Sequence, residues 1–173
     1  QQEVALEAIP RLRYHRGAEG VVLSAAEPSF VALDGLPWPR REAVEPEHHE
    51  RYGIESVQTK RGCDLHCSYC SYPEIEGRRV RRRDPARVVD ELLALSHREL
   101  PPSHVFIVDA VFNRPREHAK AVCRQMRDRG FAIPWTCYIT PLGFDLELAE
   151  VMVEAGCAGI EVGTDSGCDA VLG

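Results

Sequence analysis

Three cysteines lie within eight residues of this sequence, in the run Cys63-Asp64-Leu65-His66-Cys67-Ser68-Tyr69-Cys70. Thiolates at the spacing CxxxCxxC can each bind a different iron of a 4Fe–4S cube, which leaves the fourth iron open, whereas four cysteines would close the cluster for electron transfer. Lys60 and Arg61 come just before this run, and nearby positive charge favours the thiolates that metals require. The spacing therefore predicts an iron–sulfur site held by Cys63, Cys67 and Cys70.

A single zinc ion is the main alternative for clustered cysteines. Zinc prefers four tetrahedral ligands and paired CxxC spacing, so the fourth ligand here would have to be His66 or a distant residue. On that alternative the protein is a zinc-stabilised binding module whose arginine run at 78–83 contacts nucleic acid. The net charge of −6 argues against general nucleic-acid binding, because neutralising phosphates requires a basic face.

The remaining composition is that of an ordinary globular protein, with 44% hydrophobic and 28% charged residues. No apolar run approaches the about 20 residues of a membrane helix, and residues 1–9 lack an export signal pattern. The seven cysteines are odd in number and unevenly spread, unlike the disulfide framework of a small secreted protein. We therefore expect a reducing compartment, the cytoplasm, and no contact with a membrane.

The elements that must position the cysteine loop alternate between short strands and amphipathic helices from residue 51 onward. We expect strands at 54–59, 105–108, 135–139 and 160–162. Helices are expected to begin at Asp84-Pro85, near Pro115, at Asp145 and near Ser166. Such alternation predicts right-handed βαβ units and a parallel sheet. The cysteines follow the first strand, and β/α barrels place their active sites at the carboxyl ends of the strands.

Residues 1–50 differ in character, being rich in proline and acidic residues. Two short apolar runs, 21–23 and 30–33, are expected to form a small hairpin, and the prolines of 35–39 exclude a regular helix. We expect residues 1–50 to be an interdomain linker packed against residues 51–173, the N-terminal part of a β/α barrel. Four strands are too few for a closed barrel, so the sequence is expected to be a fragment.

The cysteine motif, with the aromatic Tyr69 just before its third cysteine, resembles the signature of the radical S-adenosylmethionine superfamily. The resemblance runs from about Ser56 to the end of the chain. It implies an enzyme with a partial (β/α) barrel of six strands, of which this chain holds about four. The open iron would then bind the amino and carboxylate groups of S-adenosylmethionine. Reductive cleavage of that cofactor would give methionine and a 5′-deoxyadenosyl radical that abstracts hydrogen from a small-molecule substrate.

Other stretches resemble the branch of this superfamily whose barrel follows a cobalamin-binding domain. These stretches are 76–79, 82–85, 88–91, 106–112 and 163–167, with a weaker likeness in the linker at 9–10 and 33–39. The resemblance implies methyl transfer, with cobalamin bound by a domain outside this chain and electrons from a donor such as flavodoxin or ferredoxin. Ring contractions and cyclisations also occur in this branch. A radical methylthiotransferase or another tRNA-modifying relative with the same motif remains an alternative.

The resemblance also implies cofactor contacts beyond the cysteines. In the superfamily the second strand often ends in a Gly-Gly-Glu-like stretch that binds the methionine amino group, and here Asp109 would replace that glutamate. Asp165 and Ser166 match in position the polar residues that touch the ribose, although this branch commonly has glutamate at the place of Asp165. Together with Tyr69, these are the expected cofactor-binding residues.

Overall fold

The central element of the fold is a parallel sheet of four strands. The computed structural model describes residues 5–9, 12–24, 30–43, 53–164 and 166–172. Within them the strands run in the order β3 (Ile54–Val57), β6 (His104–Ile107), β7 (Trp135–Ile139) and β8 (Cys157–Val162). The spatial order of the four strands is the same as their order along the chain, and every pairing is parallel. The expected α/β fold of successive βα units is therefore confirmed.

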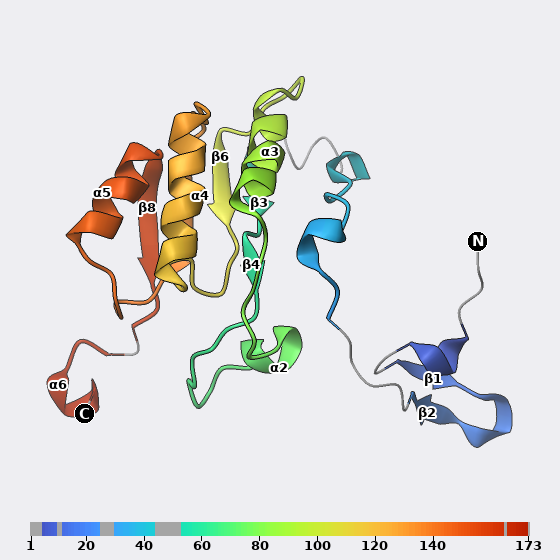
Figure 1. Ribbon diagram of the computed structural model, residues 1–173. Helices are drawn as coiled ribbons and strands as arrows, with labels where there is room; N and C mark the ends of the chain where they lie inside the picture. Colours follow the sequence, from blue (N-terminus) through green and yellow to red (C-terminus); the bar gives the residue numbers. More distant parts are fainter. Residues whose placement is uncertain (1–4, 10–11, 25–29, 44–52, 165, 173) are drawn as a thin grey trace.

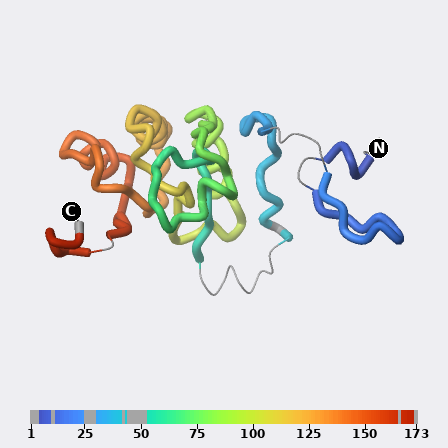
Figure 2. The backbone as a smooth tube through the Cα atoms, turned by 90° about the horizontal axis from the view of Figure 1, so that it is seen from below, coloured from blue at the N-terminus to red at the C-terminus, as the bar shows by residue number. Residues whose placement is uncertain are grey.

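Three helices connect these strands and cover one face of the sheet (Figure 1). They are α3 (Pro85–Ser96), α4 (Arg116–Asp128) and α5 (Leu146–Glu154). The expected helix starts are confirmed for all three, and α4 begins directly after Pro115. In α3 and α5 the start is capped, because the carboxylate of Asp84 accepts a hydrogen bond from the N–H of Ala86 and that of Asp145 from the N–H of Leu148. Seen from below, the three helices lie side by side along one flank (Figure 2).

The core lies between the sheet and the helices. Side chains alternate along each strand, so every second one faces the helices. Those of β6 and β7 are almost fully buried: Val105, Ile107, Trp135, Cys137 and Ile139. They pack against the buried stripes of the helices, which include Leu92, Val122, Met126 and Leu148. The opposite face of the sheet carries partly exposed side chains, among them the edge-to-face pair Phe106 and Tyr138.

Several short elements have no counterpart in the sequence-based expectations. Two of them, β4 (Lys60–Arg61) and β5 (Arg81–Arg82), form a small antiparallel ribbon. The others are α2 (Tyr72–Glu76) and the 3-10 turns η1 (Leu6–Ala8), η2 (Gly17–Glu19), η3 (Leu33–Gly35) and η4 (Arg41–Ala43). The helix expected near Ser166 is α6 (Asp169–Leu172), which begins three residues later. Within the described ranges, every helix falls short of the length and apolar character needed to cross a bilayer.

The expected hairpin of 21–23 with 30–33 is wrong. Strand β2 (Val21–Leu23) pairs instead with β1 (Arg13–His15), because the η2 turn with its two left-handed glycines closes the chain locally. The second apolar run packs on the barrel. The Phe30 ring lies 4.1 Å from the Arg81 guanidinium, and the Leu33 side chain is buried.

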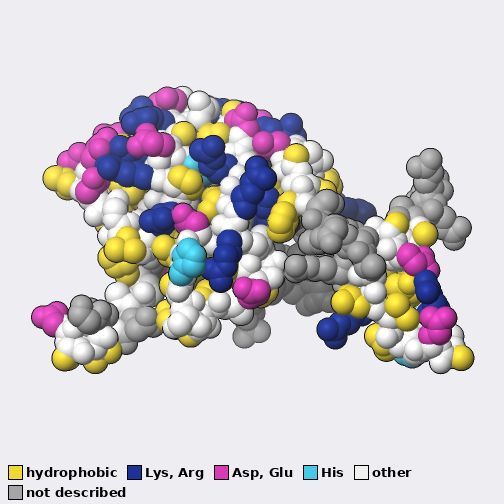
Figure 3. Space-filling model, turned by 60° about the horizontal axis from the view of Figure 1, so that its bottom comes forward, with side chains coloured by type: hydrophobic (Ala, Val, Ile, Leu, Met, Phe, Trp, Pro, Cys, Tyr) yellow, Lys and Arg dark blue, Asp and Glu magenta, His cyan; other side chains and the backbone are white. Residues whose placement is uncertain are grey.

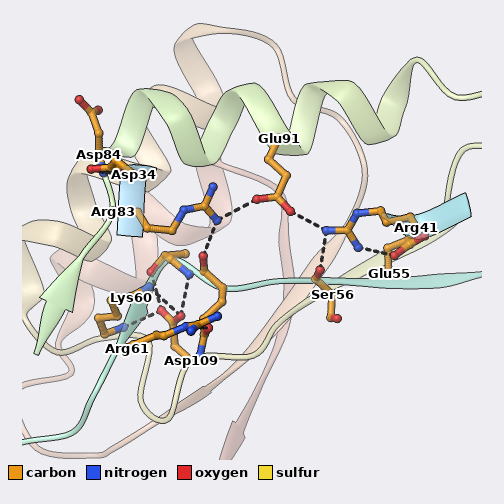
Figure 4. Close-up of polar contacts among 12 residues, drawn as sticks. Asp34, Arg41, Glu55, Ser56, Lys60, Arg61, Arg83, Asp84, Glu91 and Asp109 are labelled. Atoms are coloured by element: carbon orange, nitrogen blue, oxygen red, sulfur yellow. Dashed lines mark hydrogen bonds and ion pairs between the residues drawn. The ribbon is translucent and has the colours of Figure 1, made fainter. Parts of the chain in front are cut away.

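Residues 30–43 lie beside the outer edge of β3, away from β8 (Figure 2). Arg41 makes the central contact, since its guanidinium donates to the backbone carbonyl of Ser56 at 2.9 Å and pairs with Glu91 at 2.6 Å and with Glu55 at 2.5 Å. The three side chains are at most 13% exposed. This largely buried network, drawn in Figure 4, joins the segment before the barrel to the first strand and the first helix.

We expect Arg41→Met to lower the free energy of unfolding by about 2 kcal/mol. The variant removes one cationic partner from two buried carboxylates. The loss of stability is smaller than for a buried pair with a single cation, because Arg98 still pairs with Glu55 and Arg83 still pairs with Glu91. Urea unfolding followed by circular dichroism measures it. Arg124→Met on the exposed face of α4 is the control, with an expected change within about 0.5 kcal/mol. Equal losses from the two variants would contradict the expectation.

Candidate functional site

The cysteine loop lies at the edge of the sheet where the parallel strands end (Figure 1). The chain leaves β3, forms β4 and returns in β5, with Lys60 opposite Arg82 and Arg61 opposite Arg81. This ribbon closes a loop that contains the three cysteines and α2. Both ends of the cysteine-bearing segment are therefore held at one place.

Gly62 forms the entry to that loop, and its position requires glycine. Its φ is +92°, and a Cβ there would lie 2.4 Å from the carbonyl oxygen of Arg79. The N–H of Cys63 donates to the carbonyl of Gly77 at 3.1 Å, and the N–H of Gly62 donates to the Glu76 carboxylate at 3.1 Å. The start of the loop thus packs directly against its end, which fixes the backbone at the first cysteine.

All three expected cluster ligands are free thiols, and they differ in exposure. Cys63 is buried at the base of the loop, whereas Cys67 and Cys70 are exposed and joined by a turn in which the N–H of Cys70 donates to the Cys67 carbonyl. Tyr69 between them is 72% exposed. Among the described residues, no three His, Cys, Asp or Glu side chains converge as ligands of one ion. Three free thiols on one loop at the CxxxCxxC spacing fit a cluster, in which each thiolate binds a different iron.

Asp109 follows β6 and reaches the segment that leads into this loop (Figure 4). Its carboxylate accepts from the N–H of Thr59 at 2.7 Å and from the N–H of Lys60 at 3.2 Å. It also accepts from the Thr59 hydroxyl and pairs with the Lys60 ammonium at 2.6 Å. Asp109 is 1% exposed, so these contacts surround the carboxylate. A contact with the methionine amino group stays a prediction, and the geometry gives this residue a different set of partners.

The opposite side of Thr59 contacts helix α4. A ring nitrogen of His118 lies 3.3 Å from the Thr59 carbonyl oxygen, and the His118 side chain is buried. Burial lowers the pKa of His118, and the positive charge of Lys60 lowers it further. Because a carbonyl oxygen can only accept, the ring nitrogen that faces Thr59 is the donor of this hydrogen bond. Sequence reasoning missed Thr59 and His118, because their roles depend on contacts between residues 59 positions apart.

Of the two residues expected at the ribose, the structure describes only Ser166. Asp165 lies outside the described residues. Ser166 follows the carboxyl end of β8 and is half-buried, and its hydroxyl accepts from the N–H of Cys168 at 3.0 Å. The described contacts do not join Ser166 to the cysteine loop, so its ribose contact stays a prediction. Glu161, which interrupts an apolar strand, stands opposite Tyr138 and is exposed on the face away from the helices.

The loops that follow β6 and β7 meet the cysteine loop around a cavity of about 400 Å³. Its lining includes Asp64 from the cysteine loop, residues 113–116 and residues 142–145. The Arg114 guanidinium pairs with Asp64 at 2.9 Å, and these hydrogen bonds lower the pKa of the Asp64 carboxyl. Asn113 fixes the two loops to each other, since its side chain exchanges hydrogen bonds with both backbone groups of Thr140. Loops from three strands therefore converge at the cysteine site.

The four other cysteines lie outside this site. Cys123 and Cys137 are fully buried in the core, where burial raises the pKa of the Cys123 thiol to about 12. Cys157 is half-buried at the start of β8 and donates to the Gly159 carbonyl, and Cys168 is exposed. Cys123 and Cys137 therefore belong to the core between the sheet and the helices.

Comparison with known proteins adds an independent finding. A family model described as the radical SAM superfamily matches residues 57–172. Tryptophan 2-C-methyltransferase of Streptomyces laurentii is 34% identical over 152 residues, and cytidylyl-2-hydroxyethylphosphonate methyltransferase of Streptomyces wedmorensis is 32% identical over 124 residues. These alignments cover 79% and 69% of this chain.

Among solved structures, the radical S-adenosylmethionine methyltransferase TsrM from Kitasatospora setae, with cobalamin and a [4Fe-4S] cluster bound, superposes with a TM-score of 0.77 at 26% identity. That likeness covers 97% of this chain and 35% of TsrM, and the chain spans 25% and 22% of the two curated relatives. The family match extends over more than half of the chain and begins on β3, the strand that leads into the cysteine loop. The chain therefore belongs to the radical S-adenosylmethionine superfamily.

Proposed function

We propose that this chain supplies the cluster-binding part of a cobalamin-dependent radical S-adenosylmethionine methyltransferase. The carrying observation is the set of three free thiols on a loop fixed at the carboxyl edge of a parallel sheet, in a member of this superfamily. All three similar proteins named above are methyltransferases, and TsrM binds cobalamin together with a [4Fe-4S] cluster. These likenesses favour methyl transfer over methylthiolation or tRNA modification. Family membership disfavours a zinc-stabilised module.

In this proposal Cys63, Cys67 and Cys70 hold the cluster. When bound, the cluster would offer an open iron to the amino and carboxylate groups of S-adenosylmethionine and one electron to its sulfonium. Buried Cys63 fixes the base of the site, and the exposed Cys67 and Cys70 leave its outer side open to a cofactor. Tyr69 and Ser166 are proposed contacts of that cofactor, as is Asp165 outside the described residues.

The proposed partners follow from the same chemistry. Cobalamin would be bound by a domain outside this chain, the substrate would be a small molecule, and a donor such as flavodoxin or ferredoxin would reduce the cluster. Such an oxygen-sensitive site with free thiols belongs in the cytoplasm. On the face drawn in Figure 3, acidic side chains lie among the Lys and Arg side chains, which does not favour nucleic acid as a partner.

We expect anaerobic reconstitution of the wild-type protein to load about four irons and four sulfides per chain, and Cys67→Ala to abolish this loading. The reason is that two thiolates cannot hold the cube. Iron and sulfide assays with the visible absorption spectrum measure it. Cys168→Ala is the matched control, since it removes an exposed thiol outside the motif and should load like the wild type. A full cluster in Cys67→Ala would refute the ligand assignment.

S-adenosylmethionine should change the electron paramagnetic resonance spectrum of the reduced cluster in the intact protein. The expectation follows from three cysteine ligands, which leave one iron free to bind the amino and carboxylate groups. Adenosine lacks both groups and should leave the spectrum as it was. An unchanged spectrum at saturating S-adenosylmethionine would count against an open iron.

A further inference from the structure

A buried ion pair lies directly beneath the entry to the cysteine loop. The Lys60 ammonium contacts Asp109 at 2.6 Å, and their side chains are 3% and 0% exposed. The ammonium also donates to the Phe112 carbonyl at 3.2 Å and lies 5.6 Å from the centroid of the Phe112 ring. The buried ammonium is therefore paired with a carboxylate and hydrogen-bonded to a carbonyl inside the protein.

Asp109 contacts the backbone as well as this side chain. Its carboxylate accepts both consecutive N–H groups of Thr59 and Lys60, so it fixes the chain direction where β3 passes into β4. His118 fixes the carbonyl of Thr59 from the other side. Cys63 stands three residues after Lys60, and Gly62 between them packs against the Arg79 carbonyl without room for a Cβ. The backbone from Thr59, which Asp109 holds, to Cys63 therefore has little conformational freedom.

We propose that Asp109, through Lys60 and Thr59, is a positioning residue that fixes the cysteine loop for its cluster, and that it does not bind S-adenosylmethionine. This inference rests on the proposed function, because it presumes a cluster at the three cysteines. The carboxylate is buried and saturated by groups of the protein, whereas a cofactor ligand must present a free donor or acceptor. Asp109 therefore acts on the site through the backbone that enters it.

Asp109→Asn tests the inference in the intact protein after anaerobic reconstitution. The amide can still accept one N–H, but the Lys60 ammonium loses its counter-charge. We expect the affinity of the loop for the cluster to fall about tenfold, the loss typical of a residue that orients metal ligands. In the fraction that does load, the dissociation constant for S-adenosylmethionine should equal that of the wild type. Iron per folded chain, thermal unfolding and calorimetric titration with S-adenosylmethionine give the three readouts.

Asp128→Asn is the matched control, because it makes the same change at an exposed carboxylate at the end of α4, and it should leave all three readouts unchanged. The double variant Asp109→Asn with Lys60→Met removes both charges and keeps an acceptor for Thr59. It should load more iron than the single variant, since no buried charge is left alone. This double variant decides the question if Asp109→Asn does not fold.

Three outcomes would overturn the inference. Wild-type iron loading in Asp109→Asn, with binding of S-adenosylmethionine weakened about tenfold, would make Asp109 a direct ligand. Binding of S-adenosylmethionine that is weakened about tenfold in the iron-loaded double variant would likewise make Asp109 a direct ligand. A lower melting temperature with wild-type iron per folded chain would assign the pair to stability alone. A wild-type protein that takes up no iron would instead refute the proposed function, a result that does not depend on either substitution.

Discussion

The backbone carbonyls of β3 that point away from β6 have no strand to pair with in the described part of the chain. Such an unpaired edge attracts other strands and lets its own strand shift. Two arginines occupy this edge, since Arg41 donates to the Ser56 carbonyl of β3 and Arg83 donates at 2.7 Å to the carbonyl of Gln58, the residue that follows β3. Both guanidinium groups also pair with Glu91 of α3. The position of β3, and with it the start of the cysteine loop, depends on these edge contacts.

The cations around the cysteine loop also hold this segment in place, although the chain as a whole is acidic. Residues 60–83 contain seven Lys and Arg against three Asp and Glu, although the whole chain has a net charge of −6. In the arginine run at 78–83, Arg79 and Arg82 are exposed, whereas Arg81 and Arg83 are only partly exposed. Arg81 stacks on Phe30 and Arg83 pairs with Glu91, so these cations bind the segment around the cysteines to its neighbours.

The parts of the fold that sequence reasoning could predict are those with a local signal. Helix α3 begins with a capping Asp84 and Pro85, and strand β7 is found at the predicted residues because its side chains alternate. The ribbon of β4 and β5 has two residues in each strand, too few for any periodicity. The cysteine spacing was visible in the sequence, whereas the partners of Asp109 were not, because 49 and 50 positions separate it from Lys60 and Thr59.

The cysteine loop has a fixed end at Cys63 and an open end at Cys67 and Cys70. At Cys63 the backbone is held by the ribbon, by Gly77 and, through Thr59, by Asp109 and His118. Beyond it, at Cys67 and Cys70, exposure rises and backbone contacts become local. A site that binds a cofactor through an open coordination position needs both properties, because rigid ligands orient the metal and an unobstructed side admits the cofactor. The buried Lys60–Asp109 pair lies at the fixed end, where an internal charge pair can position the backbone without obstructing the open one.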